Sequence, residues 1–282
     1  MEKDEGSSKS ASVIKFIDIE KVIASKNEKV LRWLPQFIIN YLKRVIHQDF
    51  INEFLAKEKD KFGLDFVEAI LTSFGVKIKV EGAENIDPKS RLMIAANHPL
   101  GGMDGIALMH VVGKIRKDIL FPVNDILMNV PNIKELFIPI NKHGSNMENA
   151  RIIDQAFDGD KLMLYFPAGL VSRRQHGEIL DLEWKKTFIR KARSYKRDII
   201  PTYISGLNSN WFYGLAQWRK RLGISANLEM LYLVDEMAKQ RGKEIIIKFG
   251  KAIPYQTFDR SKKDILWAAE VKETVYKLNK KK

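Results

Sequence analysis

The pattern of apolar and polar positions changes once along the chain, near Gly75. Before this point, apolar residues recur every three or four positions from Ile17 to Phe74, which predicts a series of amphipathic helices. After it, short apolar or alternating runs are separated by helical patterns, which is typical of strands that alternate with helices. The runs predicted as strands are Val76–Val80, Leu92–Ala96, Ile119–Val123, Phe137–Ile140, Leu162–Phe166, Ile199–Ile204 and Glu244–Phe249.

This alternation predicts an α/β fold, with a mixed, largely parallel sheet of about seven strands flanked by helices and an N-terminal helical extension. The helices predicted after Gly75 are Ile106–Ile115, Asn146–Phe157, Trp184–Tyr195, Trp211–Arg221, Leu228–Lys239 and Lys262–Leu278. We expect three parts: a flexible N-terminus over residues 1–12, a helical N-terminal segment over residues 13–75 and an α/β domain over residues 76–282.

Composition and charge narrow the classes of protein and partner. The chain has 282 residues, 45% of them hydrophobic and 29% charged, which is an ordinary globular composition. It has no cysteine, which excludes disulfides, zinc–thiolate sites and a cysteine nucleophile. Its net charge of +13 predicts an anionic partner: nucleic acid, an acidic lipid surface or an acidic carrier protein. Charge alone does not distinguish these three.

The N-terminal region bears on where the protein resides. Residues 1–12 are polar and lack the apolar core of a signal peptide. No run reaches the roughly 18 consecutive apolar residues expected of a membrane span. We therefore expect a cytoplasmic protein that can still lie against a membrane. The helical region before Gly75 either caps the rest of the protein or offers a basic amphipathic surface to lipid headgroups, and both interpretations stay open.

The segment that follows the second predicted strand is the most informative for chemistry. The strand ends at Ala96, and Asn-His-Pro-Leu-Gly-Gly-Met-Asp comes next. Catalytic groups gather at the carboxyl ends of strands in α/β sheets. His98 can take up a proton near neutral pH, and a carboxylate such as Asp104 can fix its tautomer. We expect Gly101 and Gly102 to let the backbone fold back so that the two side chains meet, although Asp104 alone could simply cap the next helix.

Two later strands also end in segments that could bind a substrate. The strand ending at Phe166 is followed by Pro-Ala-Gly and then by Ser172, Arg173 and Arg174. Such a turn can aim backbone N–H groups and guanidinium groups at a phosphate or carboxylate. The strand Ile199–Ile204 is interrupted by a proline. An ordinary strand-to-loop junction is the alternative interpretation of each segment.

Taken in order, these segments resemble the sequence blocks of the glycerolipid acyltransferase superfamily, the lysophosphatidic acid acyltransferase-like proteins, over about residues 76–206. The first block, Asn-His with a nearby Asp, is matched by Asn97, His98 and Asp104. The third block, Phe-Pro-Glu-Gly and then Ser-Arg, is matched by Phe166, Pro167, Gly169, Ser172 and Arg173. The second and fourth blocks look like Phe137–Lys142 and Ile199–Ile204.

The sequence departs from the family pattern at three places. Five residues separate His98 from Asp104, where four are common; Ala168 replaces the glutamate; and Asn141 and Lys142 stand where an arginine is usual. In the family, that glutamate and arginine are associated with the glycerol-phosphate head of the acceptor, so their absence argues against a phosphoglycerol acceptor. The sequences His-Pro-Leu-Gly-Gly-Met-Asp, from His98 to Asp104, and Phe-Pro-Ala-Gly, from Phe166 to Gly169, look closer to the branch labelled putative hemolysins. That branch includes O-acyltransferases of glycine and ornithine lipids.

The resemblance implies direct acyl transfer, with no acyl-enzyme, metal or cofactor. His98 removes the proton of an acceptor hydroxyl, Asp104 orients His98, and the oxygen attacks the thioester of acyl-ACP or acyl-CoA as co-substrate. The residues implied for substrate binding are Asn97, Gly101, Gly102, Lys142, Phe166, Pro167, Gly169, Ser172, Arg173 and Arg174.

The resemblance also implies the partners. The acceptor would be a membrane-associated lipid, such as the 3-hydroxyacyl precursor of a glycine or ornithine lipid, with lysophosphatidate as the alternative. The enzyme would lie on the inner face of the cell membrane and use an acyl carrier protein. The aromatic-basic stretch from Trp211 to Arg221 either packs in the core or meets the membrane interface.

Two other classes of function stay open at this point. The first is a basic nucleic-acid-binding protein, but the chain has no recognised motif for it, so nucleic acid is not expected as a partner. The second is a metal-dependent hydrolase that uses His98 and Asp104, but the sequence lacks further His and Asp residues at ligand spacing.

Overall fold

The computed structural model describes residues 16–124, 127–128, 130–140 and 146–280. The predicted flexible N-terminus, residues 1–12, lies outside them. The chain divides into two compact units, residues 1–59 and residues 60–282. Helix α5 (Gly63–Phe74) belongs to the second unit, although the sequence pattern groups it with the N-terminal helices, because its apolar face packs on helix α6 (Gly102–Gly113).

In the first unit, the described residues 16–59 form four short helices, α1 (Ile19–Lys26), α2 (Glu28–Trp33), α3 (Gln36–Val45) and α4 (Gln48–Lys57). The Asn52 side chain exchanges two hydrogen bonds with the backbone of Ile17, which ties the start of the unit to α4. Several large apolar side chains remain exposed, among them Trp33, which is 88% exposed, and Phe37, which is 72% exposed.

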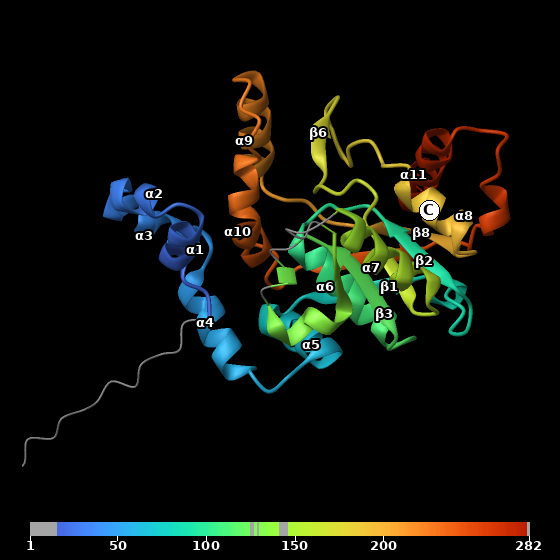
Figure 1. Cartoon of the computed structure of the whole chain (residues 1–282), viewed down its shortest axis with the longest axis horizontal. Coiled ribbons are helices and arrows are strands. Elements are labelled where there is room, and N and C mark those ends of the chain that lie inside the picture. Colours follow the sequence, from blue (N-terminus) through green and yellow to red (C-terminus); the bar gives the residue numbers. More distant parts are fainter. Residues whose placement is uncertain (1–15, 125–126, 129, 141–145, 281–282) are drawn as a thin grey trace, which may run out of the picture. The chain divides into compact units, whose positions relative to one another are not determined.

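The second unit is built on a seven-stranded mixed sheet, with strand order β1-β9-β8-β2-β5-β3-β4 (Figure 1). The strands are β1 (Lys77–Glu81), β2 (Leu92–Ala96), β3 (Ile119–Val123), β4 (Phe137–Pro139), β5 (Leu162–Tyr165), β8 (Asp198–Ile204) and β9 (Glu244–Phe249). All neighbours pair in parallel except β8 and β9, which are antiparallel. The predicted fold class is therefore confirmed.

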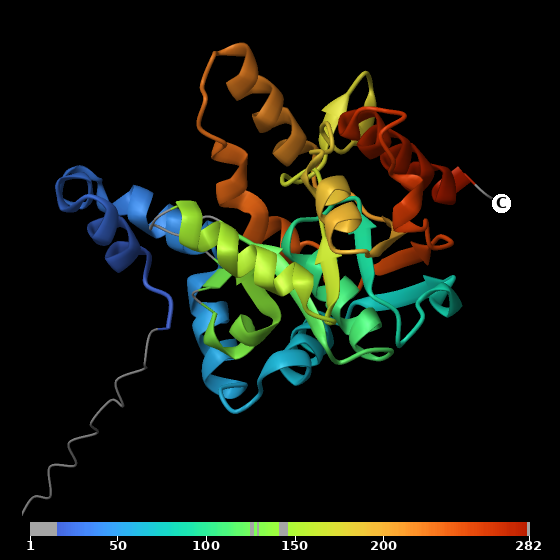
Figure 2. The same cartoon turned by 45° about the vertical axis from the view of Figure 1, so that its right-hand side comes forward.

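Helices cover both faces of this sheet (Figures 1 and 2). On one face, α7 (Asn146–Asp158), α8 (Thr187–Ser194) and α11 (Asp264–Lys280) enclose a core that includes Phe157, Trp184 and Phe188. On the other face, α5 and α6 pack together, and α6 contacts β3. Strand β2 is buried along its whole length because β5 and β8 flank it and helices cover it. Its carboxyl end therefore lies near the middle of the sheet.

Several elements differ from the sequence pattern. The polar hairpin of β6 (Arg173–Gln175) and β7 (Glu178–Leu180) was not predicted. The region predicted as the helix Leu228–Lys239 is a 3-10 turn, η4 (Leu228–Tyr232), followed by α10 (Leu233–Ala238). Helix α9 (Asn210–Arg221) agrees with the prediction. Further turns of 3-10 helix include η1 (Ala83–Asn85), η3 (Pro131–Leu136) and η5 (Tyr255–Thr257).

Candidate active site

The turn between β2 and α6 carries the two residues predicted for proton transfer. His98 lies two positions after β2, and α6 begins at Gly102, earlier than predicted, so Asp104 is in its first turn rather than at its N-cap. The N-cap position is Gly101, whose φ of 84° and ψ of −115° suit a residue without Cβ. A Cβ at Gly101 would also lie 3.0 Å from the Leu233 side chain on α10. Glycine is therefore needed here for both conformation and space.

The structure brings the imidazole and the carboxylate together. The Nδ1 atom of His98 lies 3.0 Å from Oδ2 and 3.1 Å from Oδ1 of Asp104. Asp104 is fully buried, and its carboxylate also accepts backbone N–H bonds from Leu100 at 2.8 Å, Gly101 at 3.2 Å and Gly105 at 2.8 Å. A buried charge is tolerated when its lone pairs are satisfied in this way. The carboxylate is thus fixed by the backbone independently of the ring that it orients.

The remaining ring nitrogen of His98 is left for chemistry. Its Nε2 makes no hydrogen bond with any residue that the structure describes, and its side chain is 17% exposed. The ring stacks on Phe166, with centroids 4.1 Å apart and planes 21° apart. Phe166 therefore fixes the plane of the imidazole while Asp104 fixes which nitrogen faces outward. A neutral His98 in this setting carries its proton on Nδ1 and presents a basic Nε2.

The pKa of His98 results from opposing influences. Burial of the ring is the largest and lowers the pKa, but the charge and hydrogen bond of Asp104 and the charge of Asp181 raise it, while the charge of Arg173 lowers it. The net effect raises the pKa above the ordinary value of a histidine. The imidazolium form is therefore stabilised, as expected of a base that must hold a proton during a reaction.

A second buried carboxylate, that of Asp181, binds the backbone of His98. It lies directly after β7 and is fully buried. Its Oδ1 accepts the backbone N–H of His98 at 3.1 Å and the hydroxyl of Ser172 at 2.5 Å, and its Oδ2 accepts the indole N–H of Trp184 at 2.8 Å. Ser172 closes the connection, because its own N–H donates to the carbonyl oxygen of His98 at 2.7 Å.

Sequence reasoning missed Asp181. The hairpin before it turns through His176 and Gly177, with φ of 49° and 89°. Two successive residues with positive φ are typical of a tight hairpin, and His-Gly is a weak form of the usual Asn-Gly signal. In the sequence, the His176-Gly177 dipeptide was the signal for a hairpin that brings Asp181 back to the segment of His98. The predicted helix Trp184–Tyr195 obscured it, whereas α8 begins only at Thr187.

Other predicted binding residues turn out to hold the site together. The buried side chain of Asn97 exchanges two hydrogen bonds with the backbone of Ile204, at 2.9 and 2.7 Å, and so joins the ends of β2 and β8. Gly169 donates its N–H to the carbonyl oxygen of Phe166, and the carbonyl of Pro167 accepts the N–H of Lys185. The substrate-binding roles of Asn97, Pro167 and Gly169 stay predictions.

The two arginines of the hairpin differ in environment. Arg173 is buried, donates to the Val171 carbonyl at 2.5 Å, and forms an ion pair with the fully buried Glu229 at 2.8 Å. Arg219 on α9 pairs with the same carboxylate at 2.6 Å. Burial alone would raise the pKa of Glu229, but the hydrogen bonds from Arg219 and Arg173 lower it. Arg173 therefore already shares a protein carboxylate with Arg219, and its predicted contact with substrate stays a prediction.

Arg174, the next residue, is exposed. Its guanidinium donates to the Asn210 side chain at 2.8 Å and lies 6.0 Å from the centre of the Tyr213 ring. No carboxylate pairs with it among the described residues. Of the two hairpin arginines, Arg174 is thus the better placed to meet an anionic ligand.

The structure describes two of the four remaining positions of the blocks, Gly102 and Ala168. Gly102 begins α6, where a Cβ would lie 3.2 Å from the sulfur of Met237. Ala168 is buried in the apolar core cluster, so a glutamate side chain there would enter apolar packing. Lys142 and Asn141 of the second block lie outside the described residues.

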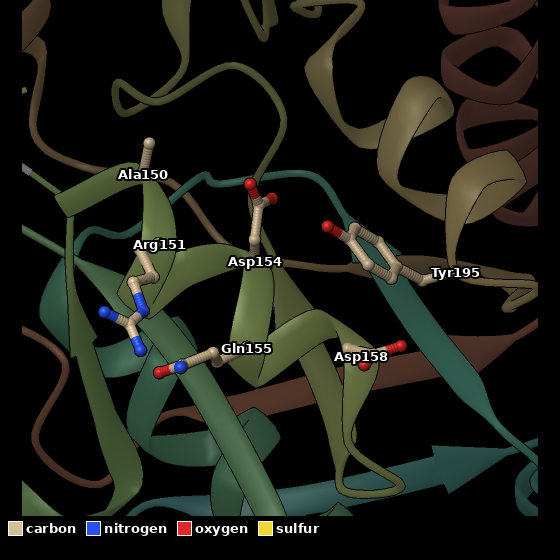
Figure 3. Close-up of a pocket in the computed structure, with 6 residues that line it drawn as sticks. All are labelled: Ala150, Arg151, Asp154, Gln155, Asp158 and Tyr195. Atoms are coloured by element: carbon tan, nitrogen blue, oxygen red, sulfur yellow. The ribbon is translucent and has the colours of Figure 1, made fainter. Parts of the chain in front are cut away.

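The structure also limits where other chemistry could occur. Among the residues described, no group of three or more His, Asp or Glu side chains is arranged to hold a metal ion. Figure 3 shows a surface hollow lined by Ala150, Arg151, Asp154, Gln155, Asp158 and Tyr195. None of the residues of the first or third block lines this hollow, and the Asp154 carboxylate in it is paired with Lys191. The His98 turn is therefore the better candidate site.

Comparison with known proteins identifies the family of the chain. A sequence model of the family described as acyltransferase matches residues 21–280. The chain belongs to the acyltransferase family. This acyltransferase is 47% identical, over 93% of its own length and 97% of the relative's, to a protein of Bacteroides thetaiotaomicron named lyso-glycine lipid O-acyltransferase. A protein of Phocaeicola vulgatus with the same name is 45% identical over 93% of this chain and 95% of its own.

This acyltransferase aligns with the 1-acyl-sn-glycerophosphate acyltransferase PlsC of Thermotoga maritima at a TM-score of 0.48, with 17% identity, covering 87% of this chain and 94% of that one. None of the described helices of this acyltransferase combines the length and the apolar character needed to cross a bilayer.

Proposed function

We propose that this enzyme transfers a fatty acyl group from an acyl thioester to the hydroxyl of a lyso-glycine lipid, a glycine whose nitrogen carries a 3-hydroxy fatty acid. Two relatives with that named activity, 47% and 45% identical over 93% of the chain, support the acceptor. The observation that carries the chemistry is the contact of both Asp104 oxygens with Nδ1 of His98, which leaves Nε2 without a protein partner among the described residues.

The proposed reaction follows from the protonation state of this pair. Nε2 of neutral His98 removes the proton of the acceptor hydroxyl as its oxygen bonds to the thioester carbonyl carbon. The carbon–sulfur bond then breaks, and the leaving thiolate takes the proton from the imidazolium. Asp104 stabilises the imidazolium and stays ionised throughout. The ester and the free thiol are the products, so the step requires no acyl-enzyme, metal or other cofactor.

The second carboxylate gives this mechanism a rigid frame. Asp181 and Ser172 bind the backbone N–H and carbonyl of His98, so the residue is held from its main chain as well as from its ring. Positioning of this kind reduces the motion that a general base must otherwise lose in the transition state. We propose that Asp104 and Asp181 together keep Nε2 in place.

The absence of a glutamate supports a carboxylate-bearing acceptor over a phosphate-bearing one. Ala168 stands where the glycerolipid pattern has glutamate, and it is buried in the core. A lyso-glycine lipid carries one carboxylate, which the exposed Arg174 could bind. Lysophosphatidate is the alternative acceptor, and the 3-hydroxyacyl ornithine lipid is a second amino-acid-lipid candidate.

The cellular setting is part of the same proposal. We infer that the enzyme acts from the cytoplasmic side, bound to the inner face of the cell membrane, where the acceptor lies. The donor is acyl carrier protein or coenzyme A carrying the acyl group, and the net charge of +13 favours both the acidic carrier and the anionic bilayer.

The test is acyl transfer from acyl-ACP or acyl-CoA to three acceptors presented in the same detergent. Lyso-glycine lipid should be esterified, whereas an N-acyl glycine without the 3-hydroxyl should not, because it lacks the attacking oxygen. Lysophosphatidate should be a poor acceptor. Preferential esterification of lysophosphatidate would refute the proposed acceptor, and full loss of activity in a metal chelator would refute the metal-free mechanism.

A further inference from the structure

Residues 207–231 carry a concentration of exposed apolar side chains that the proposed reaction does not use. In the described part of unit 60–282, seven of the twelve exposed large hydrophobic residues lie in this stretch. They are Leu207, Trp211, Trp218, Leu222, Ile224, Leu228 and Leu231. We call the stretch, which spans α9 and η4, the arm. Exposed patches of this kind on a folded domain usually mark an interaction surface.

The arm presents its largest side chains on one helical face. Trp211 and Trp218 on α9 and Leu222 at its C-cap follow one another at intervals of seven and four residues, so they share a face. They are 57%, 66% and 63% exposed. The opposite side of α9 is anchored instead, because Phe212 and Tyr213 are buried against the hairpin. The apolar face is thus held outward by packing on the other side of the helix.

The exposed charges at the end of α9 are positive. Arg221, three positions after Trp218, borders the apolar face, whereas Lys220, seven positions after Tyr213, is exposed on the other side of the helix. Glu229, the one acidic residue from 207 to 231, is fully buried by its arginine partners. Exposed tryptophan and leucine, near cations that form no ion pair within the described residues, match the interface of an anionic bilayer, where aromatic rings sit at headgroup depth and cations meet lipid phosphates. An acidic carrier protein would use the cations but would not need this area of apolar side chain.

The base of the arm is connected to the His98 turn. The Asn208 side chain donates to the carbonyl of Pro99 at 3.2 Å, and Asn208 accepts no bond through its Oδ1 in the described structure. Gly206 packs so closely on Leu100 that a Cβ there would approach its side chain to 2.8 Å. Figures 1 and 2 show α9 and the β6–β7 hairpin rising from the same end of the sheet. A bilayer on the arm would therefore lie at the end of the sheet that carries His98.

We propose that the arm is the surface by which this enzyme docks on an anionic lipid bilayer. Its apolar face enters the headgroup region, Arg221 binds lipid phosphates, and Lys220 adds electrostatic attraction to the anionic surface from the other side of the helix. This inference rests on the proposed function in one respect, namely that docking presents a lipid acceptor to His98. Binding to the bilayer itself requires no reaction. Vesicle binding and acyl transfer can therefore succeed or fail independently.

The experiment measures sedimentation of the full-length protein with phosphatidylcholine vesicles, with and without phosphatidylglycerol, and with no acyl donor or acceptor. Leu222→Ser removes an exposed leucine of the arm, and Leu266→Ser removes a leucine that is 51% exposed on α11 as the matched control. The double variant Trp218→Ser/Leu222→Ser should lower partitioning at least about tenfold, whereas Leu266→Ser should leave it within about twofold of the unmodified protein.

Charge gives a second and independent measurement. Lys220→Gln/Arg221→Gln should weaken binding to phosphatidylglycerol vesicles about 25-fold, since each cation near an anionic surface contributes about fivefold, and should scarcely change binding to pure phosphatidylcholine. Raising the salt concentration should reproduce this loss. In detergent micelles, all these variants should keep the acyl-transfer rate of the unmodified protein.

Three results would overturn the proposal. In the first, Trp218→Ser/Leu222→Ser sediments with vesicles as well as Leu266→Ser does. In the second, that variant keeps vesicle binding but loses binding to purified acyl carrier protein, which would assign the arm to the carrier. In the third, Trp33→Ser/Phe37→Ser in the first unit abolishes vesicle binding while the arm variant retains it. Failure of acyl transfer to lyso-glycine lipid would leave the docking result intact and refute only the proposed function.

Discussion

The His98 turn and the arm that begins just after β8 are built in opposite ways. In the turn, the Asp104 carboxylate is fully buried and every bond it makes is to a group within the turn or α6. In the arm, large apolar side chains point to solvent, and Trp218 is 66% exposed. The difference teaches that proton transfer requires groups fixed by satisfied bonds, whereas contact with a partner requires surface left uncovered.

The chemistry at the His98 turn and the membrane binding of the arm should be separable by substitution. Substitutions in the turn should change the chemistry and its pH dependence without changing vesicle binding. Substitutions in the arm should do the reverse. The variants below test this separation, beginning with the one for which we expect the largest effect.

His98→Ala should lower acyl transfer about a thousandfold or more, because no other base replaces Nε2. The fold should survive, since three backbone N–H groups still satisfy the Asp104 carboxylate after the ring is removed. Turnover should be measured with lyso-glycine lipid, and the melting temperature and vesicle binding should be compared with those of the unmodified enzyme. Comparable turnover in a folded His98→Ala protein would falsify the proposed mechanism.

Asp104→Asn should lower kcat about a hundredfold or more while changing KM little, because an amide no longer fixes the tautomer or stabilises the imidazolium. It should also shift the acid limb of the pH profile. The base acts when neutral, so activity rises as pH passes the His98 pKa, and the Asp104 charge raises that pKa. Without this charge the limb should move to lower pH. A limb that stays in place would remove Asp104 from this role.

Arg173→Ala should lower the free energy of unfolding by about 3 kcal/mol, because it leaves part of the charge of buried Glu229 without a partner. Arg174→Ala is the matched control, and its exposed side chain should contribute less than about 1 kcal/mol. Chemical denaturation measures both. Equal stability of the two variants would contradict the interpretation of Arg173 and Glu229 as a buried ion pair. A lowered affinity for lyso-glycine lipid in Arg174→Ala alone would place the Arg174 guanidinium at the acceptor.

Asp181→Asn should have the smallest effect on turnover, about tenfold, because Asp181 acts through the backbone of His98 rather than through its ring. Its charge also raises the pKa of His98, so its loss should move the acid limb to lower pH, by less than in Asp104→Asn. Burial raises the pKa of Asp181 and the Ser172 hydroxyl lowers it, so Ser172→Ala should move the limb in the same direction as Asp181→Asn, but less. An acid limb that stays in place in Asp181→Asn would show that Asp181 is only structural.

Much of the fold could be predicted because its central strands are rich in apolar residues. Strand β2, from Leu92 to Ala96, was predicted with its observed bounds, since a buried strand needs five consecutive apolar residues. The β6–β7 hairpin escaped because its residues from Arg173 to Glu178 are nearly all polar, so no alternation marks it. A hairpin that packs by ion pairs and cation–π contacts, as Arg173 does over Phe212, leaves no hydrophobic pattern.

The candidate site was predictable only where its members are close in sequence. His98 and Asp104 lie six positions apart, so a glycine turn was enough to suggest that they meet. Asp181 lies 83 positions from His98, and Glu229 lies 56 positions from Arg173. Contacts over such distances depend on the order of strands in the sheet, which the pattern of a single sequence does not specify. The role of Arg173 was for this reason interpreted as ligand binding without knowledge of its buried partner.

The bonds between Asn97 and Ile204 bear on how the protein is made. They join residues 107 positions apart, and the parallel pairing of β2 with β8 spans a similar length of chain. Pairings between distant segments form late in folding because closing so long a loop costs entropy before any bond forms. A ribosome-bound chain that has not yet released β8 thus lacks the clamp on the strand before His98. We therefore expect no acyl transfer from a chain that ends before β8, even though the bond between His98 and Asp104 is local.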